Sequence, residues 1–401
     1  MIYLDSNATT QVHPEVLEAM LPFLTDQCYN PSSGYRAGKL VKNAVENARV
    51  QLANLIGAEP DEICFTGCGT EANTSALMSL AGSAKSARSD GAKTRIVTSQ
   101  IEHSAVLRVC EYLEEKMGFT VEKVGVDEGG RLKLEDWKSA VEKDDVAFAT
   151  VMWANNETGV IQPIAEACQL AHDAGVPFHT DAIQAVGKTP VNVKEVEVDF
   201  LSISGHKFHA PKGVGALYVK KGVRFDPTFR GGGQERGMRS GTENVASIVG
   251  MGKAAEIMHA RLNEAGHESI GELRDHLEAR LTSELDGVLI NGSVEHRSKN
   301  TAHLSFKDCE AAGLLILLDE YGVACSAGSA CMTGKQQPSH VQTAMGFSRD
   351  RANSSLRISL SLFTTKDEIN TAADMIIKAV KKLRKVQGSG GVGPVTVYTP
   401  S

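Results

Sequence analysis

Short apolar segments alternate with stretches of helical periodicity through the first half of the chain. Six of these segments have the length and composition of buried strands: 63–66, 96–98, 147–152, 176–179, 200–203 and 216–219. Between the earlier ones, apolar residues recur with helical spacing, as in 71–80, 104–115 and 164–174. Parallel strands are buried on both faces and are joined by crossover helices. The pattern therefore predicts an α/β fold around one large, mostly parallel sheet.

Helical character becomes stronger after about Gly241. Segments 245–262 and 268–285 have the length of long helices, and 301–306 and 356–360 are candidate strands. This mixture of helices and isolated strands differs from the regular alternation before it. It predicts a second, α+β region in the last third of the chain.

The change in pattern predicts two domains. The large domain is expected to comprise residues 13–260, and the small domain residues 1–12 and 261–386. The small domain ends in a helix expected over 368–386, which has apolar residues on one face and lysines on the other. Residues 387–401 contain the run Gly-Ser-Gly-Gly and are expected to form a flexible tail.

Composition argues against several classes of protein. The chain has 401 residues, 42% hydrophobic and 23% charged, which is typical of a globular protein and not of a disordered one. Its formal net charge of −7 argues against a dedicated nucleic-acid-binding protein. The longest strongly apolar run, 314–318, is far shorter than the ~18–20 residues that span a bilayer. No signal peptide is visible, and we expect a cytoplasmic location with no membrane contact.

The eight cysteines are scattered and form no Cys-x-x-Cys pair. Metal and iron–sulfur sites need clustered ligands, and disulfide frameworks are typical of small secreted proteins. We therefore expect no metal site and no disulfide framework. Most of the cysteines are expected to be small buried residues.

Lys207 follows shortly after the apolar segment 200–203. Burying an ammonium group costs on the order of several kcal/mol, so a lysine in this position is unusual. One interpretation is a surface lysine at the end of a strand. The other is a lysine that forms a Schiff base, because desolvation lowers the pKa of the amine and the neutral amine can attack a carbonyl.

Asp181 follows another predicted strand, at the end where α/β folds bind ligands. By itself, it is equally well explained as the N-cap of a helix. Beside a Schiff-base lysine it gains a specific role. A carboxylate paired with the pyridinium nitrogen keeps pyridoxal phosphate an electron sink.

Three further features each allow two interpretations. Segment 67–72 opens a helix with small residues, which either expose backbone N–H groups to a phosphate or form an ordinary turn. His103 is either a satisfied polar residue or an imidazole that stacks on a pyridine ring and relays protons. Segment 322–334 holds Cys325 and Cys331 among small residues, which is typical of a loop with a reactive thiol or of a tight packing turn.

Eleven short motifs occur in a fixed order between residues 2 and 385. They are Asp5-Ser-Asn-Ala-Thr-Thr10, Asn30-Pro-Ser-Ser33, Gly69-Thr-Glu-Ala-Asn73, Glu102-His-Ser104, Asn155-Asn-Glu-Thr-Gly159, Asp181-Ala-Ile-Gln184, Ser204-Gly-His-Lys207, Gly231-Gly-Gly-Gln-Glu235, Arg239-Ser-Gly-Thr-Glu-Asn244, Gly328-Ser-Ala-Cys331 and Leu356-Arg-Ile-Ser359. In this order they resemble the cysteine desulfurases of the NifS/IscS type. The resemblance implies a class V, fold-type I pyridoxal-phosphate-dependent transferase. Its large domain would hold a mostly parallel seven-stranded sheet, and its small α+β domain would carry a catalytic cysteine loop.

The resemblance implies a role in cofactor binding for each matching residue. Lys207 would form the Schiff base with pyridoxal 5'-phosphate, Asp181 would pair with the pyridinium nitrogen, and His103 would stack on the ring. Gln184 would bind the ring hydroxyl, with Asn156 nearby. Four residues would hold the phosphate group: Gly69, Thr70, Ser204 and His206.

The resemblance also implies the substrate and the partners. Arg357 and Asn156 would bind the substrate, with Arg357 on the α-carboxylate of L-cysteine. Cys331 would attack the substrate sulfur and carry it as a persulfide, while L-alanine leaves. Thr242 would reach the phosphate of a partner subunit, which implies a homodimer with shared active sites. The sulfur would pass to an acceptor protein, such as an iron–sulfur cluster scaffold.

Some positions depart from the desulfurase pattern. Ser361 and Leu362 stand where the family commonly has Gly-Arg, and Tyr35 stands where desulfurases carry a histidine and selenocysteine lyases a tyrosine. Cys325 is an additional thiol, expected to be structural. The alternatives are a selenocysteine lyase, a sulfide-releasing C–S lyase of the same fold, or a non-catalytic cofactor-binding protein. Cys331 on a long loop favours the desulfurase, because the other activities depend less on a sulfur-carrying thiol.

Overall fold

A computed structural model describes residues 1–86, 93–262, 268–327 and 338–388. Its largest feature is a seven-stranded sheet with the strand order β2-β8-β7-β6-β5-β3-β4. The strands are β2 (Ile63–Thr66), β3 (Arg95–Ser99), β4 (Thr120–Val124), β5 (Val146–Thr150), β6 (Phe178–Asp181), β7 (Phe200–Ser204) and β8 (Gly215–Val219). Strand β8 runs antiparallel to both of its neighbours, and the other pairs are parallel. The predicted mostly parallel seven-stranded sheet is confirmed.

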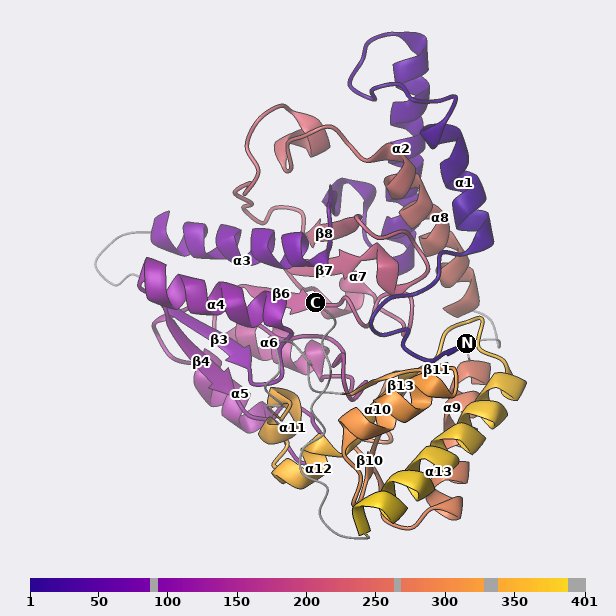
Figure 1. Cartoon of the computed structure of the whole chain (residues 1–401). Helices are drawn as coiled ribbons and strands as arrows, with labels where there is room; N and C mark the ends of the chain where they lie inside the picture. Colours follow the sequence, from indigo (N-terminus) through magenta and orange to yellow (C-terminus); the bar gives the residue numbers. More distant parts are fainter. Residues whose placement is uncertain (87–92, 263–267, 328–337, 389–401) are drawn as a thin grey trace.

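Helices cover both faces of this sheet (Figure 1). Helices α3 (Gly69–Ser86) and α4 (Ser104–Met117) share one buried cluster with Ile96 and Phe148 of the sheet. Val97 and Ala149, the next residues along the same strands, belong to a second cluster. The helices of that second cluster include α2 (Arg36–Ile56), α5 (Leu134–Val141), α6 (Ile164–Asp173) and α8 (Val245–Leu262). Successive side chains of a strand point to opposite faces, so strands covered on both sides bury both sets of side chains.

Helices α1 (Pro14–Leu24), α2 and α8 pack side by side at one end of the molecule (Figure 1). A short helix, α7 (Val193–Val196), lies between β6 and β7 in the chain. Three 3₁₀ turns, η1 (Pro60–Glu62), η2 (Gly205–Lys207) and η3 (Gln234–Gly237), occur close to strand ends or in loops. The η2 turn follows β7 directly and therefore places Lys207 at the carboxyl edge of the sheet.

A four-stranded antiparallel sheet with the order β12-β13-β10-β9 forms in the last third of the chain. Its strands are β9 (Val288–Ile290), β10 (Thr301–Phe306), β12 (Ser326–Ala327) and β13 (Ser355–Ser359). The helices of this part are α9 (Glu268–Glu284), α10 (Ala311–Glu320), α11 (His340–Ala344), α12 (Arg349–Asn353) and α13 (Lys366–Gly388). The chain start joins it, because β1 (Ile2–Tyr3) pairs with β11 (Val323–Ala324) and Leu4 is fully buried in its core.

Most predicted elements coincide with observed ones to within a few residues. Strand β4 was not predicted, because its sequence Thr-Val-Glu-Lys-Val is polar and only Val124 is buried. The division at residues 12 and 260 stays a prediction, although the core that contains Leu4 is separate from the two clusters around the large sheet. In the part of the chain that the structure describes, no helix is both long enough and apolar enough to cross a membrane. Most of the predicted tail lies outside the described residues.

Candidate active site

A cavity of about 360 Å³ lies at the carboxyl ends of the strands of the large sheet. Ten of the predicted site residues line it: Gly69, Thr70, His103, Asn156, Asp181, Gln184, Ser204, His206, Lys207 and Arg357. Five strands that point in one direction, β2, β3, β5, β6 and β7, each lead into residues of this set. The carboxyl edge of an α/β sheet is where such folds bind ligands.

Lys207 lies on the η2 turn and is partly buried. Its Nζ donates hydrogen bonds to the backbone oxygens of Asn7, at 2.7 Å, and Ala8, at 2.9 Å. Burial, and next the positive charge of Arg357, lower the pKa of Lys207 to about 8. A substantial fraction of the amine is therefore neutral in mildly alkaline solution, which is the form that attacks a carbonyl.

Asp181 ends strand β6 and is buried. Its Oδ2 accepts a hydrogen bond from Nδ2 of Asn73 at 2.7 Å, and its Oδ1 accepts one from the backbone N–H of Ile183 at 3.0 Å. Burial raises the pKa of Asp181, and the protonated form of His103 and the hydrogen bonds from Ile183 and Asn73 oppose that shift. A buried carboxylate is most stable as an anion when a cation faces it. The site is therefore suited to a cationic ring nitrogen.

The two histidines of the cavity have distinct environments. His103 caps helix α4, where its Nδ1 accepts a hydrogen bond from the backbone N–H of Ala105 at 3.1 Å. His206 lies on the η2 turn, and its Nδ1 is 3.1 Å from the hydroxyl of Thr9. Burial, and next Lys207, lower the pKa of His206 to about 4, so its imidazole is neutral near pH 7.

The start of helix α3 faces the cavity. Gly69 and Thr70 are its first two residues, and backbone N–H groups at a helix start attract anions. A Cβ at Gly69 would meet the side chains of Ile183 and Ser204, so a larger residue there would require these side chains to shift. Ser204 and His206 line the same cavity. Together these groups have the chemistry of a phosphate-binding site.

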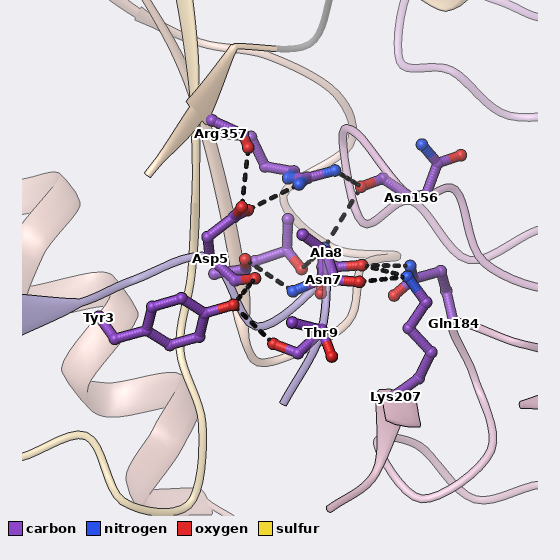
Figure 2. A network of polar contacts seen from close by, with 12 residues as sticks. Tyr3, Asp5, Asn7, Ala8, Thr9, Asn156, Gln184, Lys207 and Arg357 are labelled. Atoms are coloured by element: carbon purple, nitrogen blue, oxygen red, sulfur yellow. Dashed lines mark hydrogen bonds and ion pairs between the residues drawn. The ribbon is translucent and has the colours of Figure 1, made fainter. Parts of the chain in front are cut away.

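Arg357 reaches the cavity from strand β13 of the small sheet. Its Nη1 donates to the backbone oxygen of Asn156 at 2.9 Å, and its Nη2 forms an ion pair with Oδ1 of Asp5 at 2.7 Å. Figure 2 shows the guanidinium between these two groups. A planar guanidinium binds carboxylates with two parallel hydrogen bonds, so Arg357 has the chemistry needed for a carboxylate-bearing substrate.

Sequence reasoning missed a buried network that holds Gln184. Its Nε2 donates to the backbone oxygen of Asn7 at 2.9 Å, and its Oε1 accepts from Nζ of Lys188 at 2.6 Å. Lys188 also donates to Oδ1 of Asn7 at 2.9 Å. Burial lowers the pKa of Lys188 well below that of an ordinary lysine. Asn7 lies within the first motif of the chain, but nothing in its local pattern assigned it to the site.

The structure does not bring every predicted residue together. Thr242 lines a different cavity, together with Gly67 and Arg239. Cys331 lies outside the described residues. Cys325 is partly exposed between β11 and β12, and burial raises the pKa of its thiol to about 12. Cys68, which had no predicted role, is exposed and lines the main cavity.

The positions that depart from the family pattern lie in different parts of the structure. Ser361 and Leu362 line a smaller cavity that Lys188 and Lys207 also border. Tyr35 precedes helix α2 and is exposed.

Four of the seven cysteines in the described part of the chain are buried, in keeping with the expected small apolar role of most of them.

The residues present fit pyridoxal phosphate. The cavity volume lies in the range of ligand pockets, roughly 300–1,000 Å³. A lysine with a lowered pKa, a buried carboxylate and an anion-binding helix start surround the same space. Moreover, Oδ1 of Asn73, beside Asp181, is buried without a hydrogen-bond partner among the described residues. These donors and charges match an aldehyde, a ring nitrogen and a phosphate.

Comparison with known proteins agrees with this geometry. The model of the aminotransferase class-V family matches residues 2–371. The chain is 46% identical over 396 residues to the cysteine desulfurase NifS of Azotobacter vinelandii, covering 98% of this chain and 96% of that protein. It is also 46% identical over 386 residues to cysteine desulfurase 2 of Trichormus variabilis, covering 96% and 94% of the two chains.

Solved structures show the same likeness. A NifS-like protein superposes with a TM-score of 0.85 at 37% identity, covering 97% of this chain and 99% of the other. A NifS-like protein from Rickettsia africae has a TM-score of 0.84 at 31% identity, with 96% and 99% covered. The chain therefore belongs to the class-V aminotransferase family, a family of pyridoxal-phosphate enzymes. Within it, the chain is similar to the cysteine desulfurases, and the predicted family and fold are confirmed.

Proposed function

We infer that this chain is a pyridoxal-phosphate-dependent cysteine desulfurase, which takes sulfur from L-cysteine and releases L-alanine. One observation carries this conclusion: Lys207, Asp181 and Arg357 line a single cavity in a chain that is 46% identical to a named cysteine desulfurase over 98% of its length. Those three side chains supply an amine, a ring-nitrogen partner and a carboxylate receptor. A non-catalytic cofactor-binding protein would not need the third.

The cofactor supplies an electron sink for the pair released when the substrate Cα loses its proton. Lys207 would hold the cofactor through its neutral amine, and its Nζ would accept the Cα proton of the substrate. Asp181 would keep the ring nitrogen protonated, because a buried carboxylate favours a cation beside it. His103 would contact the ring, and Gln184 would bind its hydroxyl with Asn156 nearby. Four residues would hold the phosphate: Gly69, Thr70, Ser204 and His206.

The remaining roles concern the substrate and its sulfur. Arg357 binds the α-carboxylate of L-cysteine, with Asn156 beside it. The Cys331 thiolate attacks the substrate sulfur, the carbon–sulfur bond breaks, and the sulfur remains on Cys331 as a persulfide. A proton replaces the sulfur on the substrate carbon, which yields L-alanine. An acceptor protein, such as an iron–sulfur scaffold, then takes the persulfide sulfur.

A homodimer with shared active sites is part of the proposal. Large apolar side chains are exposed on α1 and α2, among them Leu17, Leu24 and Leu40. Exposed apolar side chains gathered on one part of a surface are typical of an interface. Thr242 lines a cavity separate from the main one within its own chain, which supports a role at the phosphate of the partner subunit.

A spectrum and a product assay test this function together. Purified protein loaded with pyridoxal phosphate is expected to show a visible absorption band that disappears in Lys207→Ala. With L-cysteine, the wild-type protein is expected to release one L-alanine for each sulfur transferred to a thiol acceptor. Loss of the band together with full retention of L-alanine release in the variant would contradict the role of Lys207. Release of selenium and L-alanine from L-selenocysteine, with no L-alanine from L-cysteine, would favour the selenocysteine lyase.

A further inference from the structure

We infer that Asp5 is a positioning residue, which fixes the guanidinium of Arg357 in the orientation that receives the α-carboxylate of the substrate. This inference rests on the proposed function, because that function makes Arg357 the carboxylate receptor. Asp5 lies at the very start of the chain, 352 residues from Arg357 in sequence. Only the fold brings the two side chains together.

The guanidinium of Arg357 is fixed at two points. Oδ1 of Asp5 accepts from Nη2 at 2.7 Å, and the backbone oxygen of Asn156 accepts from Nη1 at 2.9 Å (Figure 2). Two contacts at different nitrogens define the plane of a rigid, planar group. One contact alone would leave the group free to rotate about it. Asp5 is therefore the second fixed point of the plane.

Asp5 itself is held firmly. Its Oδ2 accepts from the hydroxyl of Ser326 at 2.9 Å, so both carboxylate oxygens have partners. On either side of it, Ser6 and Leu4 make backbone hydrogen bonds to Ser359, at 3.0 and 2.8 Å. These bonds tie Asp5 to the strand that carries Arg357, two residues away. Backbone hydrogen bonds between the chain start and β13 therefore hold Asp5 and Arg357 next to each other.

Tyr3 fixes the turn that follows Asp5. Its hydroxyl donates to the backbone oxygens of Asp5, at 3.0 Å, and Thr9, at 2.8 Å (Figure 2). The same turn carries the backbone oxygens of Asn7 and Ala8 that accept from Lys207. The chain start thus contacts both the carboxylate receptor and the amine of the site.

Asp5 does not need to leave Arg357 when a substrate arrives. A guanidinium has five N–H donors, and the two contacts use two of them. The buried Nε of Arg357 has no partner within the described residues. Asp5 also offsets part of the effect of Arg357 on the pKa of Lys207, because Arg357 lowers this pKa and Asp5 raises it. Asp5 can therefore orient Arg357 and remain paired during binding.

The test compares two ligands that differ only by the carboxylate, L-alanine and ethylamine. Their dissociation constants are measured on holoenzyme by titration of the visible spectrum. In Asp5→Asn, which keeps the size of the side chain, we expect the constant of L-alanine to rise about tenfold and that of ethylamine to change by less than about twofold. The matched control is Asp374→Asn, which breaks the exposed Arg280–Asp374 ion pair and should change neither constant.

Further variants separate the possible failures. Ser326→Ala keeps the charge of Asp5 but removes the hydrogen bond to its second oxygen. We expect the dissociation constant of L-alanine to rise about threefold and that of ethylamine to stay unchanged. Equal weakening of both ligands in Asp5→Asn, or tighter binding of L-alanine, would overturn the inference. Arg357→Lys reports on the proposed function itself. If Arg357→Lys leaves the preference for L-alanine intact, the carboxylate assignment fails; if it removes the preference while Asp5→Asn does not, only the role of Asp5 fails.

Discussion

Burial, and next the positive charge of Arg357, lower the pKa of the Lys207 amine to about 8, from 10.5 for an ordinary lysine. Only the neutral amine captures an aldehyde. The rate at which the cofactor-free protein captures pyridoxal phosphate is therefore expected to rise about tenfold per pH unit below 8 and to level off above it. Stopped-flow absorbance measures this rate, with Lys207→Ala as the blank. A midpoint near 10.5 would contradict the shift.

Asp181 offers a second prediction for a single residue. Asp181→Asn keeps the size of the side chain but removes its buried negative charge, and it replaces one of the two oxygens that accept hydrogen bonds with an amide donor. We expect the variant to retain bound cofactor and to lose turnover by on the order of a hundredfold. The cofactor content is measured by absorbance after alkaline release, and turnover by L-alanine formation. Near-normal turnover with full cofactor content would count against the pairing.

Ten cavity residues could be predicted because each follows a strand or belongs to a short motif. Asp5, Asn7 and Lys188 could not be assigned a role in this way. Their contacts are hydrogen bonds to residues that lie far away in sequence, such as Asp5 to Arg357 and Asn7 to Lys188. A sequence pattern describes neighbours along the chain, and these partners become neighbours only when the chain start pairs with β11 and β13.

The elements themselves were predictable where burial is two-sided. Strands β5 and β7 are buried along their whole length, and their apolar runs are unmistakable. Helix α8 was predicted with its observed bounds, Val245–Leu262. The polar strand β4 was missed because it has few buried apolar side chains. Its place in the sheet comes from backbone hydrogen bonds to β3. The two-residue strand β1 is too short for any periodicity.

The η3 turn contains two residues with unusual backbone angles. Glu235 and Arg236 have φ angles of 47° and 57°, in the left-handed region that residues other than glycine seldom adopt. Glu235 is buried against Arg49, with oxygen–nitrogen distances of 2.7 and 2.9 Å, and also accepts from the backbone N–H of Phe65. The buried ion pair therefore holds a strained turn in place.

Removing the charge of Glu235 leaves the buried Arg49 with Glu46, whose side chain is half exposed, as its remaining carboxylate partner. Glu235→Gln is expected to lower the free energy of unfolding by about 3 kcal/mol. Urea denaturation followed by circular dichroism measures it. Asp226→Asn, which removes the exposed Arg230–Asp226 pair, is the control and should cost less than about 0.5 kcal/mol. Equal small losses in both variants would show that the buried pair does not stabilise the turn.

For the whole molecule, shared active sites predict rescue between two inactive variants. Lys207→Ala lacks the amine in its own site, and Thr242→Asp places a negative charge against the phosphate of its partner's site. A mixed dimer of the two contains one intact site. Co-expression of both chains should therefore restore about a quarter of the wild-type activity per subunit, since half of the dimers are mixed. Each variant expressed alone is the control, and activity no higher than theirs would contradict site sharing.

Transfer of sulfur from L-cysteine to Cys331 is what distinguishes a desulfurase from the lyases of the same fold. Mass spectrometry of the peptide that contains Cys331, taken after turnover without an acceptor, detects this transfer. We predict that this peptide gains one sulfur atom, that the peptide carrying Cys325 does not, and that Cys331→Ala keeps its cofactor but forms neither persulfide nor L-alanine from L-cysteine. A sulfur atom on Cys325 instead, or full L-alanine formation by Cys331→Ala, would contradict the account.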